Sequence, residues 1–176
     1  VLASAVSMDK LYTKIIVDTL GISQARYVGV YKDEISDAYV YEKIEEKLGY
    51  PAFVKPANAG SSIGIGKAKN KEELLKCIDE AFKFDRKILV EEFLTGPEVS
   101  VLSFTDGKVV IPMVSSMDHK RALDNDEGLN TGGMGTIAPN PYYTPEIAKE
   151  CMEKIFLPTI DAMNKEGRTF KGCLYF

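Results

Sequence analysis

Residues 52–68 read AFVKPANAGSSIGIGKA, and this stretch decides which class of fold the sequence predicts. Ala52–Lys55 has the pattern of a short buried strand, which Pro56 closes. Ala57–Ser62 is a loop of small residues, and Ile63–Ala68 is a second strand. Helical patterns precede and follow this pair of strands, so the chain is predicted to be an α+β protein.

Lys55 and the loop after it favour an anion as ligand. A lysine at the end of a buried strand costs free energy unless an anion neutralises it. The backbone N–H groups of a glycine- and serine-rich loop can approach phosphate oxygens closely. The loop does not match the P-loop pattern G-x-x-x-x-G-K-[ST], because Ser61 stands where the first glycine would fall. It is not a dinucleotide-binding fingerprint either, and the alternative is a flexible glycine turn inside a hairpin.

A second candidate site is the run VEEFLTGPE at residues 90–98, where three carboxylates surround an apolar pair. A carboxylate or a backbone carbonyl can accept a hydrogen bond from an exocyclic amine, and a second carboxylate can bind a sugar diol. This run is therefore predicted to bind a nucleobase and its ribose. The alternative is an ordinary strand end with solvated acids.

A third candidate lies in Ser115–Tyr143, a long stretch rich in Gly, Asn, Asp and Pro. Asp118-His119-Lys120-Arg121 contains a basic pair that could bind a phosphate, and Asn130–Gly135 (NTGGMG) could wrap a small substrate through its backbone. Two such runs in one long loop favour function over a mobile surface loop. The single histidine, His119, is not predicted to act as a general base.

The rest of the chain is predicted to alternate helices with strands, in two clusters divided near Gly96. Helices are expected over Asp9–Leu20, Asp37–Leu48, Asn70–Phe82 and Thr144–Glu166. Further strands are expected over Arg26–Tyr31, Ile88–Phe93, Val99–Phe104, Val109–Val114 and Gly172–Phe176. Asp106-Gly107 predicts a hairpin turn, Pro158 is expected to kink the last helix, and Val1–Val6 is expected to end a strand or linker.

Composition excludes several classes of protein. Hydrophobic residues make up 45% and charged residues 27% of the chain, which is enough apolar sequence for a real core. The net charge of -4 argues against a nucleic-acid partner. No apolar run approaches the roughly 20 residues of a membrane-spanning helix. The three cysteines, Cys77, Cys151 and Cys173, form no C-x-x-C pair and are predicted to be reduced, mostly buried thiols of a cytoplasmic protein.

These motifs together resemble those of ATP-grasp enzymes. Residues 1 to about 94 resemble the central domain of D-alanine–D-alanine ligases, in Met8-Asp9-Lys10, Phe53-Val54-Lys55-Pro56, Ala59–Gly64 and Leu89-Val90-Glu91. Residues from about 91 to 176 resemble phosphoribosylamine–glycine ligases, in Glu91–Leu94, Asp118–Arg121, Asn130–Gly135 and Gly172–Phe176. The resemblance implies an α+β ATP-grasp fold of two lobes with the nucleotide cleft between them. Residues 1–95 would form the small lobe, and 96–176 the start of a truncated large lobe.

By this resemblance, most of the candidate residues are implied to bind ATP. They are Lys10 and Lys55 at the phosphates, Ser61 and Ser62 over them, Glu91, Glu92, Phe93 and Leu94 at adenine, and Glu98 at the ribose. Lys55, Lys120 and Arg121 are the implied catalytic residues, and the implied substrate residues are Asn130, Thr131, Gly132, Gly133, Met134 and Gly135. In both families a carboxylate becomes an acyl phosphate that an amine then attacks, with lysines and Mg²⁺ stabilising the charge.

The sequence departs from both families in two respects. Their magnesium ligands, an acidic residue and an asparagine, lie beyond Gly172–Phe176, where this chain ends, and their upstream domain is absent. ATP binding with little ligase turnover is therefore expected, and a non-catalytic nucleotide-binding scaffold is the alternative. The change of family near Glu91–Glu98 suggests an engineered or recombinant hybrid, with a natural divergent ligase as the alternative. A free strand edge after Phe176 would let a second copy pair as a homodimer.

Overall fold

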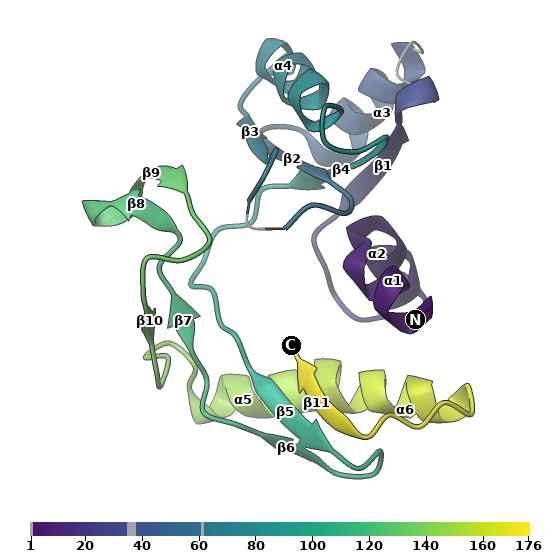
Figure 1. The fold of residues 1–176 in the computed structure, drawn as a ribbon, viewed down its shortest axis with the longest axis vertical. Coiled ribbons are helices and arrows are strands. Elements are labelled where there is room, and N and C mark those ends of the chain that lie inside the picture. The colour runs from purple at the N-terminus through teal and green to yellow at the C-terminus, as the bar shows by residue number, and fades with distance from the viewer. Residues whose placement is uncertain (1, 35–37, 61) are drawn as a thin grey trace. The chain divides into compact units, whose positions relative to one another are not determined.

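The computed structural model describes residues 2–34, 38–60 and 62–176 (Figure 1). The chain divides into two compact units, Val1–Thr19 with Ser23–Thr95 as unit 1, and Leu20–Ile22 with Gly96–Phe176 as unit 2. Each unit combines helices with antiparallel strands, so the predicted α+β class is confirmed.

Unit 1 contains a four-stranded antiparallel sheet in the order β1-β4-β2-β3. Its strands are β1 (Tyr27–Tyr31), β2 (Ala52–Pro56), β3 (Gly66–Ala68) and β4 (Lys87–Glu92). Its helices are α1 (Leu2–Met8), α2 (Lys10–Thr19), α3 (Ala38–Leu48) and α4 (Lys71–Ala81), with a short 3-10 turn η1 (Lys32–Glu34). Strands β1, β2 and β4 and the last three helices lie close to where the sequence patterns predict them. Strand β3 is shorter than the predicted strand Ile63–Ala68, because Ser62–Gly64 form a turn.

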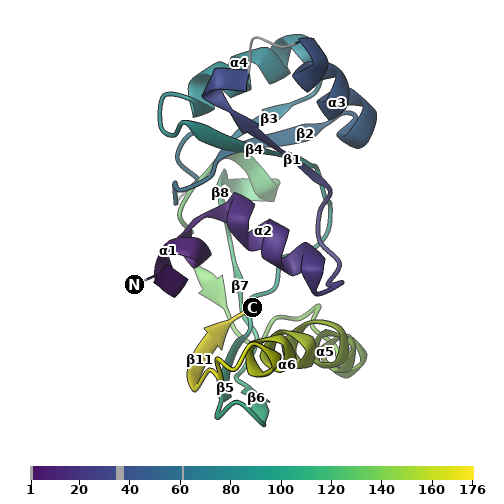
Figure 2. The same cartoon turned by 90° about the vertical axis from the view of Figure 1, so that its right-hand side faces the viewer.

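The two faces of this sheet carry different residues because side chains alternate along a strand. Helices α3 and α4 cover one face and α2 lies on the other (Figure 2). Ile88 and Val90 of β4 belong to the main core, on the face that α3 and α4 cover. The other buried residues of this core are Val28, Val30, Ile44, Leu48, Ala52, Val54, Ala68, Leu74, Ile78, Ala81 and Phe82. Leu89 instead packs with Leu11 of α2. The odd-numbered residues of β4, which include Glu91, therefore belong to the α2 face.

The starts of two helices follow from their capping residues. Asn70 Oδ1 accepts from the Glu73 N–H at 3.0 Å, and the Glu73 carboxylate accepts from the Lys69 N–H at 2.8 Å. This capping-box-like arrangement starts α4 at Asn70, where the helix is expected to begin. Asp9 caps α2 by accepting from the N–H groups of Leu11 and Tyr12 at 3.0 and 3.1 Å.

The prediction for the first six residues was wrong. Leu2–Met8 forms helix α1, whereas Val1–Val6 was expected to end a strand or linker. A short apolar run without periodicity cannot distinguish the two structures, and alanine, leucine and methionine are all good helix formers.

Gly29 lets α2 lie close to the sheet. A Cβ at Gly29 would lie 2.7 Å from both terminal methyl groups of Leu11, which is only 4% exposed. We expect Gly29→Val to lower the free energy of unfolding by about 1–3 kcal/mol, because the added atoms overpack this contact. Chemical denaturation measures the change. Gly60→Val is the control, since a Cβ there meets nothing within 4 Å, and an equal loss in both variants would contradict the prediction.

Unit 2 is built on a three-stranded sheet in the order β11-β5-β6, with a helical run packed against it (Figure 1). The strands are β5 (Leu102–Thr105), β6 (Val110–Pro112) and β11 (Gly172–Tyr175). The helical run is α5 (Pro145–Cys151), the π-helical turn η3 (Met152–Phe156) and α6 (Leu157–Lys165). The buried core of unit 2 comprises Val101, Val110, Phe156 and Ile160.

The predicted hairpin and helix start in unit 2 are confirmed. The Asp106 carboxylate accepts from the N–H groups of Lys108 and Val109 at 2.8 and 2.9 Å, and Gly107 has a φ of +90°. Thr144 caps α5, with proline in the first turn. Pro158 is the second residue of α6, which begins directly after the π-helical turn, and such a turn is one way in which a helix accommodates a residue without a backbone N–H.

The prediction that Ser115–Tyr143 is a loop was wrong in part. Two small antiparallel pairs form within it, β7 (Met117–Asp118) with β10 (Thr136–Ile137), and β8 (Arg121–Leu123) with β9 (Glu127–Asn130). The turn η2 (Asp124–Asp126) joins β8 to β9. Strands of two to four residues are too short for alternation to reveal them.

The cysteines also differ from expectation. Cys77 and Cys151 are half-buried and Cys173 is exposed, all three as free thiols, so the expectation of mostly buried thiols was wrong. Cys173 is exposed because β11 leaves its side of the small sheet uncovered. Within the described ranges, no helix is both long and apolar enough to cross a bilayer.

Candidate functional site

Four lysines and two carboxylates gather on the α2 face of the unit 1 sheet. The lysines are Lys10, Lys14, Lys55 and Lys87, and the carboxylates are Asp9 and Glu91. We call this group the lysine face. Its formal charge is +2 when all six groups are ionised, which is the balance that a polyphosphate would neutralise.

Glu91 lies at the centre of the lysine face. Its side chain is 8% exposed; Oε1 lies 2.8 Å from Lys14 Nζ, and Oε2 pairs with Lys55 Nζ. Burial alone would raise the pKa of the Glu91 carboxyl, but the charges and hydrogen bonds of Lys55 and Lys14 outweigh burial and lower it. Glu91 is therefore a buried anion that two ammonium groups hold.

Lys10 extends from the start of α2 towards the loop after β2. Its Nζ donates to the carbonyl oxygens of Pro56 at 3.4 Å, Ala57 at 3.5 Å and Ala59. Burial, followed by repulsion from Lys55, lowers the pKa of Lys10. The charge of Lys55 thus disfavours the charged form of Lys10, and an anion bound beside them would relieve that repulsion.

Among the other residues of unit 1 predicted to bind the nucleotide, Phe93 lies beside this face: its ring centroid is 5.2 Å from that of Phe53, whose ring the Lys55 ammonium group approaches. Ser61 lies outside the described residues. Ser62 adopts a φ of +58°, in the left-handed region. Glu92 alternates to the opposite side of β4, where Arg26 Nε and Nη2 each lie 2.7 Å from its Oε2. The Phe93 N–H donates to the Pro51 carbonyl at 3.3 Å, and the Leu94 side chain is exposed.

A second charged group lies in unit 2. Lys120 Nζ pairs with Asp118 and lies 3.6 Å from a Glu98 carboxylate oxygen. The hydrogen bond from Lys120 to Asp118 is the main reason that the pKa of Lys120 is raised. Arg121 Nη1 donates to the Gly128 carbonyl at 2.9 Å. The predicted catalytic residues Lys120 and Arg121 are thus neighbours in sequence with separate partners.

The glycine-rich run lies against the basic motif through backbone hydrogen bonds. The Thr131 and Met134 N–H groups donate to the carbonyls of Lys120 and His119, each at 2.7 Å, and the His119 N–H donates to the Gly135 carbonyl at 2.9 Å. Two motifs that the sequence singled out separately are therefore adjacent. Of the predicted substrate residues in this run, Gly132, Gly133 and Met134 are exposed and Thr131 is half-buried, while the backbone of Asn130 pairs with Arg121.

The Thr131 hydroxyl holds the glycine-rich run in shape. It donates to the Lys120 carbonyl at 2.9 Å and accepts from the Gly133 N–H at 3.1 Å. We expect Thr131→Val, which keeps the shape but loses both bonds, to cost about 1–2 kcal/mol of local stability. Hydrogen exchange of the Gly133 amide should become several-fold faster. Thr131→Ser, which retains the hydroxyl, is the control, and unchanged exchange in Thr131→Val would refute this role.

A match across nearly the whole chain accompanies this geometry. The family model described as phosphoribosylglycinamide synthetase, ATP-grasp (A) domain, matches residues 8–176. The chain belongs to this ATP-grasp family. The ATP-grasp resemblance predicted from the motifs is thereby confirmed.

Relatives of both predicted ligase types are found. Phosphoribosylamine–glycine ligase from Fusobacterium nucleatum subsp. nucleatum is 33% identical over 99% of this ATP-grasp chain and 41% of the relative. D-alanine–D-alanine ligase from Bacillus cytotoxicus is 47% identical over 73% of the chain and 38% of the relative. The crystal structure of phosphoribosylamine–glycine ligase from Thermotoga maritima superposes with a TM-score of 0.77 at 29% identity, over 95% of this chain and 42% of that one. The chain spans about two fifths of the length of these ligases.

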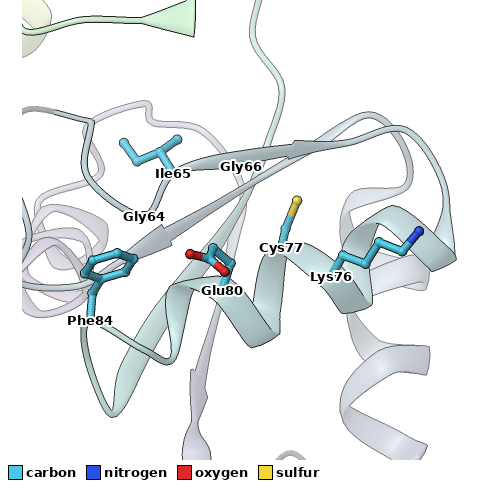
Figure 3. A pocket seen from close by; sticks show the side chains of 7 residues that line it. All are labelled: Gly64, Ile65, Gly66, Lys76, Cys77, Glu80 and Phe84. Atoms are coloured by element: carbon cyan, nitrogen blue, oxygen red, sulfur yellow. The ribbon is translucent and has the colours of Figure 1, made fainter.

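A hollow of about 440 Å³ in unit 1 lies away from the lysine face (Figure 3). It is lined by Gly64, Ile65 and Gly66 beside β3, and by Lys76, Cys77, Glu80 and Phe84 on and after α4. Helix α4 packs on the opposite face of the sheet from α2. Burial, with a smaller effect of Glu73, raises the pKa of the Cys77 thiol, so this cysteine is not activated as a nucleophile.

The residues that the structure describes do not fit a metal site in this ATP-grasp chain. They include no group of three or more His, Cys, Asp or Glu side chains that could hold a metal ion. Two acids of unit 2, Glu98 and Asp118, both face the Lys120 ammonium group.

Sequence reasoning missed three members of the lysine face, namely Asp9, Lys14 and Lys87. Lys14 lies four residues after Lys10 and therefore on the same face of α2, which helical periodicity could have revealed. Lys87 opens β4 and pairs with Asp9, the cap of α2. The pairing of Lys87 with Asp9 becomes visible only in the tertiary structure, because the two residues are far apart in the sequence.

Proposed function

We propose that this ATP-grasp chain binds ATP through the lysine face and forms the nucleotide-binding part of an ATP-dependent carboxylate–amine ligase. The observation that carries the proposal is that Lys10 reaches the carbonyls of the loop directly after Lys55, while Lys55 pairs with Glu91 on the same face. Burial first, and then the charge of Lys55, lower the pKa of Lys10. Two ammonium groups kept this close favour a polyanionic ligand, and a triphosphate is the one that the family uses.

The lysines would act through charge and position. In the proposed reaction a carboxylate attacks the γ-phosphorus of ATP to give an acyl phosphate and ADP, and an amine then displaces phosphate to form an amide. Lys10 and Lys55 would neutralise charge on the phosphates. For Lys55 this means exchanging its bond to Glu91 for one to a phosphate oxygen.

The other predicted roles remain proposals that rest on the family resemblance. They are adenine at Glu91–Leu94, ribose at Glu98, a phosphate lid at Ser61 and Ser62, and the substrate at Lys120, Arg121 and Asn130–Gly135. In the structure Glu91 already bonds two lysines. A role at adenine would therefore require it to share an oxygen with the base.

The substrate pair distinguishes two ligase types, both of which have relatives here. The family model, which covers residues 8–176, favours the phosphoribosylamine–glycine type, while the 47% identity to a D-alanine–D-alanine ligase favours the other. Two such matches in one chain also support the hypothesis that the chain is a hybrid of the two ligase types. Sequencing the source DNA tests it, because a single uninterrupted genomic reading frame would contradict a hybrid.

The test combines binding with turnover. Titration calorimetry with a non-hydrolysable ATP analogue should show one binding site, and its absence would overturn the proposal. Release of ADP and phosphate is then measured with glycine plus phosphoribosylamine, and separately with D-alanine. We expect little turnover with either, because the 176 residues span about two fifths of the ligases they match. Efficient turnover with one pair would identify the substrates and contradict this expectation.

A further inference from the structure

Lys14 differs from Lys55, the other lysine that bonds Glu91, because the hydrogen-bonding capacity of Lys14 is filled by the protein. Its Nζ lies 2.8 Å from Glu91 Oε1 and donates to the Ala25 carbonyl at 3.1 Å and to Gln24 Oε1 at 3.4 Å. An ammonium group has three N–H donors, so none is left for a ligand. The side chain is only 14% exposed.

Lys55 is placed differently on the same carboxylate. Its side chain is 28% exposed and its Nζ pairs with Glu91 Oε2. Among residues 2–34, 38–60 and 62–176, its other recorded contact is with the ring of Phe53, whose centroid lies 5.4 Å from Nζ. Two of its N–H groups are therefore available to a ligand, in contrast to those of Lys14.

We infer that Lys14 is a positioning residue that acts through Glu91: it supplies the permanent counter-charge of this buried carboxylate, so that Lys55 can turn to a bound nucleotide. The inference rests on the proposed function. Moving Lys55 from Glu91 to a phosphate oxygen would leave a lone buried carboxylate if Lys14 were absent, and an unpaired buried charge is costly. With Lys14 in place, Glu91 keeps one partner.

The groups that face Glu91 define what a titration would report. Lys14 approaches Glu91 from α2, and Lys55 approaches it from β2. Lys10 interacts with it at longer range: the charge of Glu91 partly opposes the lowering of the Lys10 pKa. Tyr27 lies opposite it on β1. Of these groups, only Lys14 and Lys55 bond its oxygens directly, so a change of charge at position 14 should appear in the titration of Glu91 itself.

The experiment compares Lys14→Gln, which retains a hydrogen-bonding group without the charge, with Lys14→Arg, which retains the charge. Carbon-detected NMR of the Glu91 carboxyl should show its pKa raised in Lys14→Gln and close to that of the parent in Lys14→Arg. Calorimetry with the ATP analogue should show about tenfold weaker binding for Lys14→Gln. The loss of affinity in Lys14→Gln should become smaller as pH falls towards the Glu91 pKa, because protonation of Glu91 removes the unpaired charge. Lys14→Arg should restore most of the affinity at neutral pH.

The results separate this inference from the proposed function. If the parent binds the analogue but the two variants share the parent's Glu91 titration and affinity, the inference fails and the function stands. If the parent binds no nucleotide, the proposed function fails, and the Glu91 titration in the two variants still decides whether Lys14 supplies the counter-charge. If Lys14→Gln does not fold, Lys14→Met at position 14 replaces it, and loss of folding in both neutral variants with Lys14→Arg intact supports the role of the charge.

Discussion

Glu91→Gln is expected to lower the free energy of unfolding by about 3 kcal/mol, more than any other single change of charge in unit 1. Removing one partner of a buried ion pair typically costs about 3–5 kcal/mol, because the other partner is left as an uncompensated charge. Here two partners are left, Lys14 and Lys55, with side chains 14% and 28% exposed. Their residual contact with water places the expected loss at the lower end of the range, and urea denaturation would measure it.

The same variant should show a characteristic dependence on pH. The folded protein lowers the pKa of Glu91 below its ordinary value of 4.5. A group whose pKa is lowered on folding stabilises the folded state above its unfolded pKa, and this stabilisation is lost as pH falls through the folded pKa. The difference in unfolding free energy between the parent and Glu91→Gln should therefore be constant near neutral pH and shrink below about pH 4.5.

Glu92→Gln is the matched control, because it makes the same chemical change one residue further along β4. The Glu92 carboxylate pairs with Arg26, whose side chain is 59% exposed, on the other side of the strand. Exposed pairs of this kind contribute little to stability. A loss in Glu92→Gln as large as that in Glu91→Gln would show that burial between two lysines is not what makes Glu91 important.

The order of elements in unit 1 could be predicted because each one carries a local signal. Alternation marked β1, a short apolar run marked β4, and a capping residue marked α4. Glycines with positive φ, Gly21 and Gly49, follow the ends of α2 and α3. A local signal, however, does not specify how one element packs against or pairs with another. The pairing of Glu91 with Lys55 depends on the antiparallel register that sets Phe53 opposite Glu91, and no local pattern specifies that register.

The candidate site shows the same division between local and tertiary information. Lys55 and Glu91 could be singled out because a charged residue within an apolar strand needs a partner. Helical periodicity places Lys14 on the same face of α2 as Lys10. Its burial could not be predicted, because a lysine in an amphipathic helix is ordinarily solvated and only the packing of α2 on the sheet buries it. In unit 2 the basic motif and the glycine-rich run could be recognised, but the backbone hydrogen bonds that join them, such as the one from His119 to Gly135, could not.

Lys55→Met should have the largest effect on nucleotide binding. Loss of a charge-assisted contact to a phosphate is expected to weaken binding of the ATP analogue by about 1.5–3 kcal/mol, which is roughly 10- to 150-fold in affinity. Methionine keeps much of the apolar stem of the lysine, so the contact with Phe53 can persist. Glu91 keeps Lys14 as a partner in this variant. Stability should therefore fall much less than in Glu91→Gln, and calorimetry can be performed on folded protein.

Lys76→Met is the control for this experiment, since it removes a lysine of unit 1 that lies on α4 with a side chain 72% exposed. It should bind the analogue as the parent does. The affinity of Lys55→Met should also depend less on salt than that of the parent, because one fewer ammonium group interacts with the phosphates. Equal affinity of Lys55→Met and Lys76→Met would mean that the nucleotide does not bind at the lysine face. A triphosphate bound there would lose affinity without Lys55, because Lys55 is the more exposed of the two lysines that bond Glu91.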